Sequence, residues 1–290
     1  MNNTLVSIII PTFNRISQLK KALNSIYDQT YQNYEIIIID NFSIDGTKNF
    51  INKEINKNIK YFEIKNNGNI AMSRNLGIKK SSGSLIAFLD SDDFWFKTKL
   101  EKSVDYLLND YDLTYHDMKI VNGKNKIKKK NTGYTRQLSS RTQHDLLQNG
   151  PAFPTSSVVI KKEVFEKIDL FDVSNELITW EDYDAWIRVS KITNKFKKID
   201  ETLGCLVIDG NNLSNDDNQL KNIDNFKLKY FTRRDYPQWC YIRFAKIYFK
   251  KRNFLKASEA LKKIKSNELD LKNLFIIKYI TIICKLTIYR

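Results

Sequence analysis

Short apolar runs alternate with helix-patterned segments through residues 5–89, and this alternation restricts the possible fold more than any other feature. Three uncharged and mostly apolar runs, at Leu5–Ile10, Ile36–Ile39 and Leu85–Leu89, are typical of strands buried on both faces. Between them, apolar residues recur at helical spacing. The sequence therefore predicts an α/β fold with a mostly parallel sheet flanked by helices.

Chemically useful side chains stand where three of these predicted strands end. Pro11 and Thr12 follow the first run, Asp40 follows the second, and Asp90-Ser91-Asp92 follows the run at Leu85–Leu89. Ligands of open α/β sheets bind outside the carboxyl ends of the strands. We therefore expect these side chains to converge on one edge of the sheet.

The acidic stretch after Leu89 suggests a cation site. Asp90 and Asp92 are two residues apart, so in an extended chain their carboxylates point to the same side and repel each other. A hard divalent cation would relieve that repulsion and leave coordination positions open for phosphate oxygens. The alternative is a solvated acidic turn that caps the next helix.

The remaining pattern predicts further strands and helices, most of which carry no candidate functional residues. Strands are expected over residues 113–121, 156–160 and 203–208, and a helix over residues 97–108. Ser17 is a plausible N-cap for the first helix. A helix should also begin near Trp180, where Glu181 and Asp182 either complement the helix dipole or take part in catalysis.

Charge divides the chain into two parts. The net charge is +15, and residues 221–290 hold 18 lysines and arginines against five acids, a net charge of +13. We therefore expect a nearly neutral domain over residues 1–215 and a basic, aromatic, helical region over residues 216–290 that contacts something anionic. The apolar segment 274–289 is interrupted by lysines and predicts either a packed helix or a membrane-surface helix.

Three widely spaced cysteines, Cys205, Cys240 and Cys284, show neither a disulfide framework nor a metal-type spacing. That usage favours a reducing, cytoplasmic setting. The N-terminal residues lack the positive charge of a signal peptide, and we expect no membrane-spanning segment.

Five motifs in the first 220 residues resemble those of family 2 inverting glycosyltransferases of the GT-A fold. They occur in the family's order: Val6–Arg15, Ile38–Thr47, Ser73–Gly77, Phe88–Asp93 and Trp180–Tyr183. The resemblance implies a GT-A (Rossmann-like) domain and leaves the basic C-terminal helical extension unexplained.

The resemblance also implies roles for individual residues. Pro11, Thr12 and Arg15 would line the nucleotide pocket, and Asp40 would accept a hydrogen bond from uracil. Arg74 would approach the diphosphate or the donor sugar, and Asp90, with Ser91 beside it, would hold ribose or sugar hydroxyls. Asp92 would bind Mn²⁺ or Mg²⁺.

For the catalytic base, the resemblance implies Asp182, with neighbouring Glu181 as the alternative. Many relatives carry a histidine as a further metal ligand where this chain has Asp209. A carboxylate is a competent hard-metal ligand, although Asp209 could equally be a turn residue.

The function implied is a metal-dependent, inverting hexosyltransferase of bacterial surface polysaccharide synthesis, including lipopolysaccharide. It would use a nucleotide-sugar, UDP-hexose or UDP-N-acetylhexosamine, and a glycan or lipid-linked acceptor, at the inner face of the cell membrane and without nucleic acid. The alternatives are a nucleic-acid-binding protein that uses the basic aromatic region, and an inactive relative that only binds sugar nucleotide.

Overall fold

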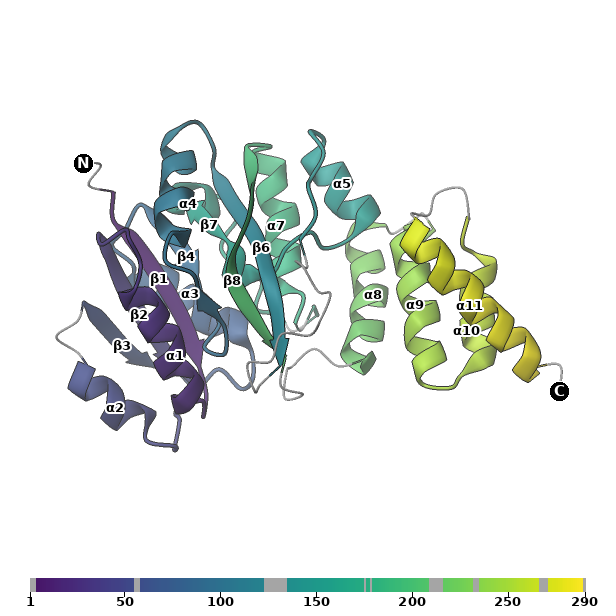
Figure 1. Cartoon of the computed structure of the whole chain (residues 1–290), viewed down its shortest axis with the longest axis horizontal. Coiled ribbons are helices and arrows are strands. Elements are labelled where there is room, and N and C mark those ends of the chain that lie inside the picture. Colours follow the sequence, from purple (N-terminus) through teal and green to yellow (C-terminus); the bar gives the residue numbers. More distant parts are fainter. Residues whose placement is uncertain are drawn as a thin grey trace. The chain divides into compact units, whose positions relative to one another are not determined.

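A computed structural model describes residues 4–54, 58–122, 135–174, 176–177, 179–208, 216–231, 235–265 and 271–288 of the protein. The chain forms two compact units, which Figure 1 draws in sequence colours. The first comprises Met1–Gln143, Ala152–Asn175 and Thr179–Asn212. The second comprises His144–Pro151, Glu176–Ile178 and Leu213–Arg290.

One mixed sheet organises the first unit. In the described part of the chain it has eight strands in the order β3-β2-β1-β4-β7-β6-β8-β5. The strands are β1 (Val6–Thr12), β2 (Tyr34–Asp40), β3 (Ile59–Glu63), β4 (Leu85–Phe88), β5 (Phe94–Trp95), β6 (Leu113–Asn122), β7 (Val159–Lys161) and β8 (Phe196–Ile208). The pairs β1–β2, β2–β3, β1–β4 and β6–β8 are parallel, whereas β4–β7, β6–β7 and β5–β8 are antiparallel.

Helices cover the sheet. They are α1 (Ile16–Tyr27), α2 (Thr47–Glu54), α3 (Ile70–Lys80), α4 (Lys99–Leu108), α6 (Lys162–Glu166) and α7 (Glu181–Ile192), with a 3₁₀ turn η1 (Thr155–Ser157) before β7. The mostly parallel α/β sheet predicted from the apolar runs is confirmed.

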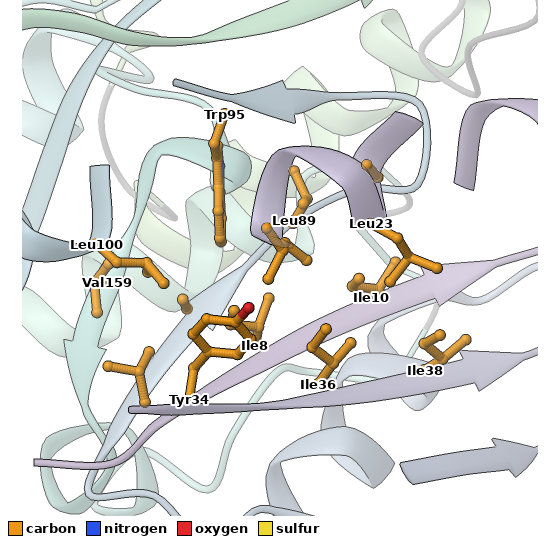
Figure 2. Packing of buried hydrophobic residues seen from close by; sticks show 14 of the residues in the cluster. Ile8, Ile10, Leu23, Tyr34, Ile36, Ile38, Leu89, Trp95, Leu100 and Val159 are labelled. Atoms are coloured by element: carbon orange, nitrogen blue, oxygen red, sulfur yellow. The ribbon is translucent and has the colours of Figure 1, made fainter. Parts of the chain in front are cut away.

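Alternate residues of β1 and β2 pack on opposite faces of the sheet, as the period-2 geometry of strands requires. On one face, Ile8, Ile10 and Ile36 join Leu23 of α1 and Leu100 of α4 in a buried cluster (Figure 2). Both faces of these strands are buried, which explains why their sequences are continuously apolar and do not alternate between apolar and polar residues.

The opposite face of the sheet holds α3 and an aromatic cluster. A Cβ placed on Gly77 would lie 2.5 Å from Cγ2 of Ile9, so a glycine is what lets α3 approach β1 this closely. Phe88 at the end of β4 packs on Phe171 and Trp186, with ring centroids 5.3 and 6.2 Å away. This packing holds α7 against the strand that carries the acidic stretch.

Three local predictions need correction. Ser17 does not cap the first helix: Asp45, from the loop after β2, accepts a hydrogen bond from the Ile16 amide at 2.8 Å. The predicted strand over residues 156–160 begins only at Val159, because residues 155–157 form the 3₁₀ turn. The strand predicted over residues 203–208 begins earlier, at Phe196.

The second unit is helical. It contains most of α5 (Thr142–Asn149) together with α8 (Asp216–Tyr230), α9 (Gln238–Lys250), α10 (Phe254–Lys262) and α11 (Leu271–Ile288). Trp239 of α9 donates its indole N–H to the Leu147 carbonyl at 3.0 Å and packs on Phe226 of α8. No helix among the described residues is long and apolar enough to cross a bilayer.

Candidate active site

The carboxyl ends of β1, β2 and β4 lie side by side, since these strands are parallel neighbours. Thr12 at the end of β1 pairs with Asp40 at the end of β2, and Phe88 of β4 pairs with Ile9 of β1. Asp90 follows two residues after Phe88, so the acidic stretch emerges at the same edge. Arg15, just beyond β1, forms an ion pair with Asp92 across this edge.

A buried arginine joins the acidic stretch to α7. Arg74 on α3 has a side chain only 4% exposed. Its Nη2 lies 2.7 Å from Asp90 Oδ1 and its Nη1 lies 2.7 Å from Glu181 Oε1. The guanidinium also lies 5.6 Å from the ring centre of Phe171. Residues separated by more than 100 positions in the sequence are therefore held within one ion-pair network.

Asp182 lies beside this network at the start of α7 and is less buried than Glu181. Its Oδ2 accepts a hydrogen bond from the Thr155 hydroxyl at 2.6 Å, and its Oδ1 accepts from the Tyr183 amide at 2.7 Å. Ser156, the next residue of the 3₁₀ turn, accepts from the Asp90 amide at 3.1 Å. One turn thus holds the carboxylate of Asp182 and the backbone of Asp90.

Burial raises the pKa values of three acids at this edge, Asp92, Glu181 and Asp182, and neighbouring carboxylates add to the effect. The pKa of Asp92 is raised first by burial and then by the charge of Asp90, with Arg15 opposing. Burial raises the pKa of Glu181 to about 7 and also raises that of Asp182, while the Arg74 guanidinium opposes both shifts. These carboxylates are therefore costly to keep ionised, and an additional positive charge would stabilise them.

Asp93 differs from its neighbours because it is turned into the protein. It is almost fully buried and accepts a hydrogen bond from the Val207 amide of β8 at 2.9 Å. Burial, followed by the charge of Asp92, raises its pKa well above the usual value. Asp93 therefore links the acidic loop to β8 through this hydrogen bond.

Asp40 lies at the same edge but has no exposed surface. Its Oδ1 accepts from the Ser43 hydroxyl at 2.6 Å, and its Oδ2 accepts from the Tyr61 hydroxyl at 2.6 Å. Ser43 in turn accepts from the Asn14 amide at 2.7 Å, which ties the loop after β2 to the loop after β1. Asp40 therefore shapes the loops of this edge.

Three of the other predicted site residues lie at this edge, and one lies outside the described chain. Pro11, Thr12 and Ser91 are buried at the same edge, and the Thr12 hydroxyl has no hydrogen-bond partner within the described protein. Asp209, the predicted second metal ligand, lies outside the described residues. In the described part of the chain, no group of three or more His, Cys, Asp or Glu residues could hold a metal ion by itself.

Sequence reasoning missed Thr155 and Ser156. The run Ser156–Ile160 that follows Thr155 suggested a strand. Two adjacent residues with hydroxyl groups form no motif that would indicate a functional site. The two prolines just upstream, Pro151 and Pro154, were the available signal that an irregular segment precedes β7.

Comparison with known proteins matches this chain to glycosyltransferases. A family model described as "Glycosyl transferase family 2" matches residues 7–169. An uncharacterized glycosyltransferase of Rickettsia felis is 34% identical over 214 residues, which are 72% of this chain and 34% of that protein. This chain therefore spans about a third of that relative's length.

A relative with a specific activity in its name is WfgD of Escherichia coli. WfgD, a UDP-Glc:α-D-GlcNAc-diphosphoundecaprenol β-1,3-glucosyltransferase, is 29% identical over 195 residues, covering 67% of this chain and 73% of WfgD.

Solved structures share the fold at lower sequence identity. Staphylococcus aureus TarS in complex with UDP aligns with a TM-score of 0.60 at 20% identity, over 91% of this chain and 76% of that chain. The mannosyltransferase PcManGT of Pyrobaculum calidifontis, in complex with GDP-Man and Mn²⁺, aligns with a TM-score of 0.56 at 16% identity, over 94% of this chain and 78% of that chain.

Proposed function

Because the chain belongs to glycosyl transferase family 2, we propose that it is an inverting, divalent-metal-dependent hexosyltransferase. It would move a sugar from a uridine diphosphate hexose or N-acetylhexosamine to a hydroxyl group of a glycan or lipid-linked acceptor, in bacterial surface polysaccharide synthesis. The observation that carries the proposal is the Asp90–Arg74–Glu181 network, because it holds the acidic stretch and the start of α7 on either side of one arginine.

The donor would lie along the carboxyl edge of β1, β2 and β4. UDP in the aligned TarS structure and the UDP-glucose named for WfgD support a uridine donor. Pro11, Thr12 and Arg15 would face the nucleotide, while Asp90 and Ser91 would face ribose or sugar hydroxyls. Arg74 would lend positive charge near the diphosphate while keeping its carboxylate partners.

The two carboxylate oxygens of Asp40 already accept hydrogen bonds, one from Ser43 and the other from Tyr61. Asp40 would accept from a uracil N–H only if one of these two donors turned away. Otherwise Asp40 would act by holding the loop of residues 41–46 where the base binds.

The donor set at the acidic stretch fits Mn²⁺ or Mg²⁺. Asp90 and Asp92 offer hard oxygen ligands. Burial, followed by the charge of Asp90, raises the pKa of Asp92, so a cation would stabilise its ionised form. When bound, the cation would neutralise charge on the departing diphosphate. In the structure Arg15 pairs with Asp92, so Arg15 would shift toward the phosphates as Asp92 turns to the cation.

Asp182 is the proposed general base. In an inverting transfer the acceptor oxygen bonds to the anomeric carbon while the bond from that carbon to the diphosphate oxygen breaks. The hydroxyl proton passes to the base. Asp182 suits this role because it is more exposed than Glu181 and is held by the Thr155 hydroxyl. Glu181 forms an ion pair with Arg74 and would hold the guanidinium of Arg74 in place.

Asp92→Asn tests the metal assignment. We expect metal-dependent transfer or hydrolysis of the UDP-sugar to fall at least about tenfold, because the neutral amide is a weaker ligand and no longer offsets the cation's charge. Release of UDP, measured across a Mn²⁺ titration, checks this. Asp105→Asn, an exposed acid of α4, is the matched control and should behave as wild type. Unchanged activity and metal dependence in Asp92→Asn would defeat the assignment.

A further inference from the structure

Helix α11 is apolar on two opposite sides, although only one of them is packed. Ile277, Ile280 and Cys284 are buried against the second unit. The clusters that receive them contain Ala245 of α9 and Ala257 of α10. This side accounts for the packed-helix alternative predicted from sequence.

The opposite side carries four large apolar residues that are each more than half exposed, although the ring edge of Tyr279 also contacts Phe249. Phe275 is 73% exposed, Tyr279 is 60% exposed, and Ile282 and Leu286 are each 58% exposed. Spacings of four, three and four residues place them within an arc of about 60° on an α-helix. They form a continuous stripe, called here the α11 stripe. Surface hydrophobics normally occur singly, and a contiguous stripe marks an interaction surface.

Charged residues identify the partner. Lys278 and Lys285 are exposed and lie seven residues apart, along one border of the α11 stripe. The region from residue 221 to the end of the sequence carries a net charge of +13. A second copy of the chain would bring like charge against like charge, which opposes pairing through this face. An apolar stripe bordered by lysines is instead complementary to a bilayer with anionic headgroups.

We propose that the α11 stripe inserts into the interfacial region of an anionic membrane. The helix would lie in the plane of the surface, with its four apolar side chains among the upper acyl chains and its two lysines beside the lipid phosphates. Helix α11 would then have one side packed on the protein and the other in lipid. The inference deepens the proposed function, since a lipid-linked acceptor would lie at that surface, but binding to vesicles does not require sugar transfer.

Flotation of the full-length protein with vesicles tests the proposal. We expect binding to vesicles containing about one third phosphatidylglycerol, weaker binding to pure phosphatidylcholine, and a decrease with added salt because the lysine contribution is screened. The Phe275→Ser/Ile282→Ser variant should lose at least about tenfold in vesicle affinity. The Lys278→Glu/Lys285→Glu variant should lose a similar factor, and only on anionic vesicles. Leu228→Ser, which changes an exposed leucine of α8, is the matched control and should keep wild-type affinity.

A second readout avoids dependence on the folding of the double variants. Tyr279→Trp should gain fluorescence quenching by brominated acyl chains relative to wild type, and Leu228→Trp should not. Wild-type protein that does not float with anionic vesicles, or stripe variants that bind as well as wild type, would overturn the proposal. So would a dimer that the Phe275→Ser/Ile282→Ser change converts to monomer, because the stripe would then bind a second copy. UDP affinity should be unchanged in all these variants. Loss of vesicle binding can therefore be told apart from loss of the proposed transferase activity.

Discussion

Asp182→Asn is expected to lower kcat for sugar transfer by about 10²–10⁴-fold, the range that a positioned general base contributes. Asparagine keeps the size of the side chain and can still accept the hydrogen bond from Thr155, so the fold and donor affinity should be preserved. Initial-rate measurements of UDP release, with acceptor present and absent, give kcat. Calorimetric titration of UDP gives the affinity.

The control for this prediction is Glu181→Gln. It removes the neighbouring carboxylate, which pairs with Arg74, and we expect a smaller fall in kcat than for Asp182→Asn. The reverse order of effects would assign the base to Glu181. In wild type, burial raises the pKa of Asp182. The base must be ionised to accept a proton, so activity should fall as pH drops through that raised pKa. Asp182→Asn should abolish this acid limb in the residual rate.

Arg74→Met is expected to lower the free energy of unfolding by about 3–5 kcal/mol, the typical cost of leaving buried charges without their partner. Arg74 is buried between Asp90 and Glu181, and methionine fills similar volume without supplying charge or donors. Urea unfolding followed by circular dichroism measures the change. Lys48→Met, which breaks the exposed Lys48–Glu63 pair, is the matched control and should cost less than about 1 kcal/mol.

The pH dependence of this loss has a definite sign. The pKa of Glu181 in the folded protein is raised to about 7, above the ordinary value of 4.5, so its protonation favours the folded state and its ionisation opposes it. Without Arg74, the pKa of Glu181 rises further. The difference between wild type and Arg74→Met should therefore be constant from about pH 5 to 6 and grow as the pH rises through about 7, where Glu181 ionises in folded wild type but stays protonated in the variant. Adding Glu181→Gln to Arg74→Met should recover part of the loss, and no recovery would show that the two side chains do not act together.

The sequence was most informative where chemistry follows a local pattern. Alternating apolar and helical segments predicted the parallel strands β1, β2, β3 and β4. The strand ends drew attention to Asp90 and Asp92, which the structure places beside Arg74 and Arg15. These features are readable because strand burial and strand ends are encoded within a few consecutive residues.

Long-range pairings could not be read in this way. The contact between Arg74 and Glu181 joins residues 107 positions apart, and no local periodicity records it. The cap of α1 illustrates the same limit: Ser17 is well placed in sequence, but Asp45, from another loop, satisfies the Ile16 amide. For α11, the apolar composition allowed either packing or membrane contact. Only the exposed fractions show that one side of the helix is packed and the opposite side is in solvent.

We propose that the edge formed by β1, β2 and β4 binds a nucleoside diphosphate through a divalent cation. Calorimetric titration of UDP into the wild-type protein, with Mn²⁺ and with a chelator, tests it most directly. We expect one UDP per chain and at least about tenfold tighter binding with Mn²⁺ than with the chelator. Failure to bind UDP in both conditions, or equal affinity in both, would contradict it.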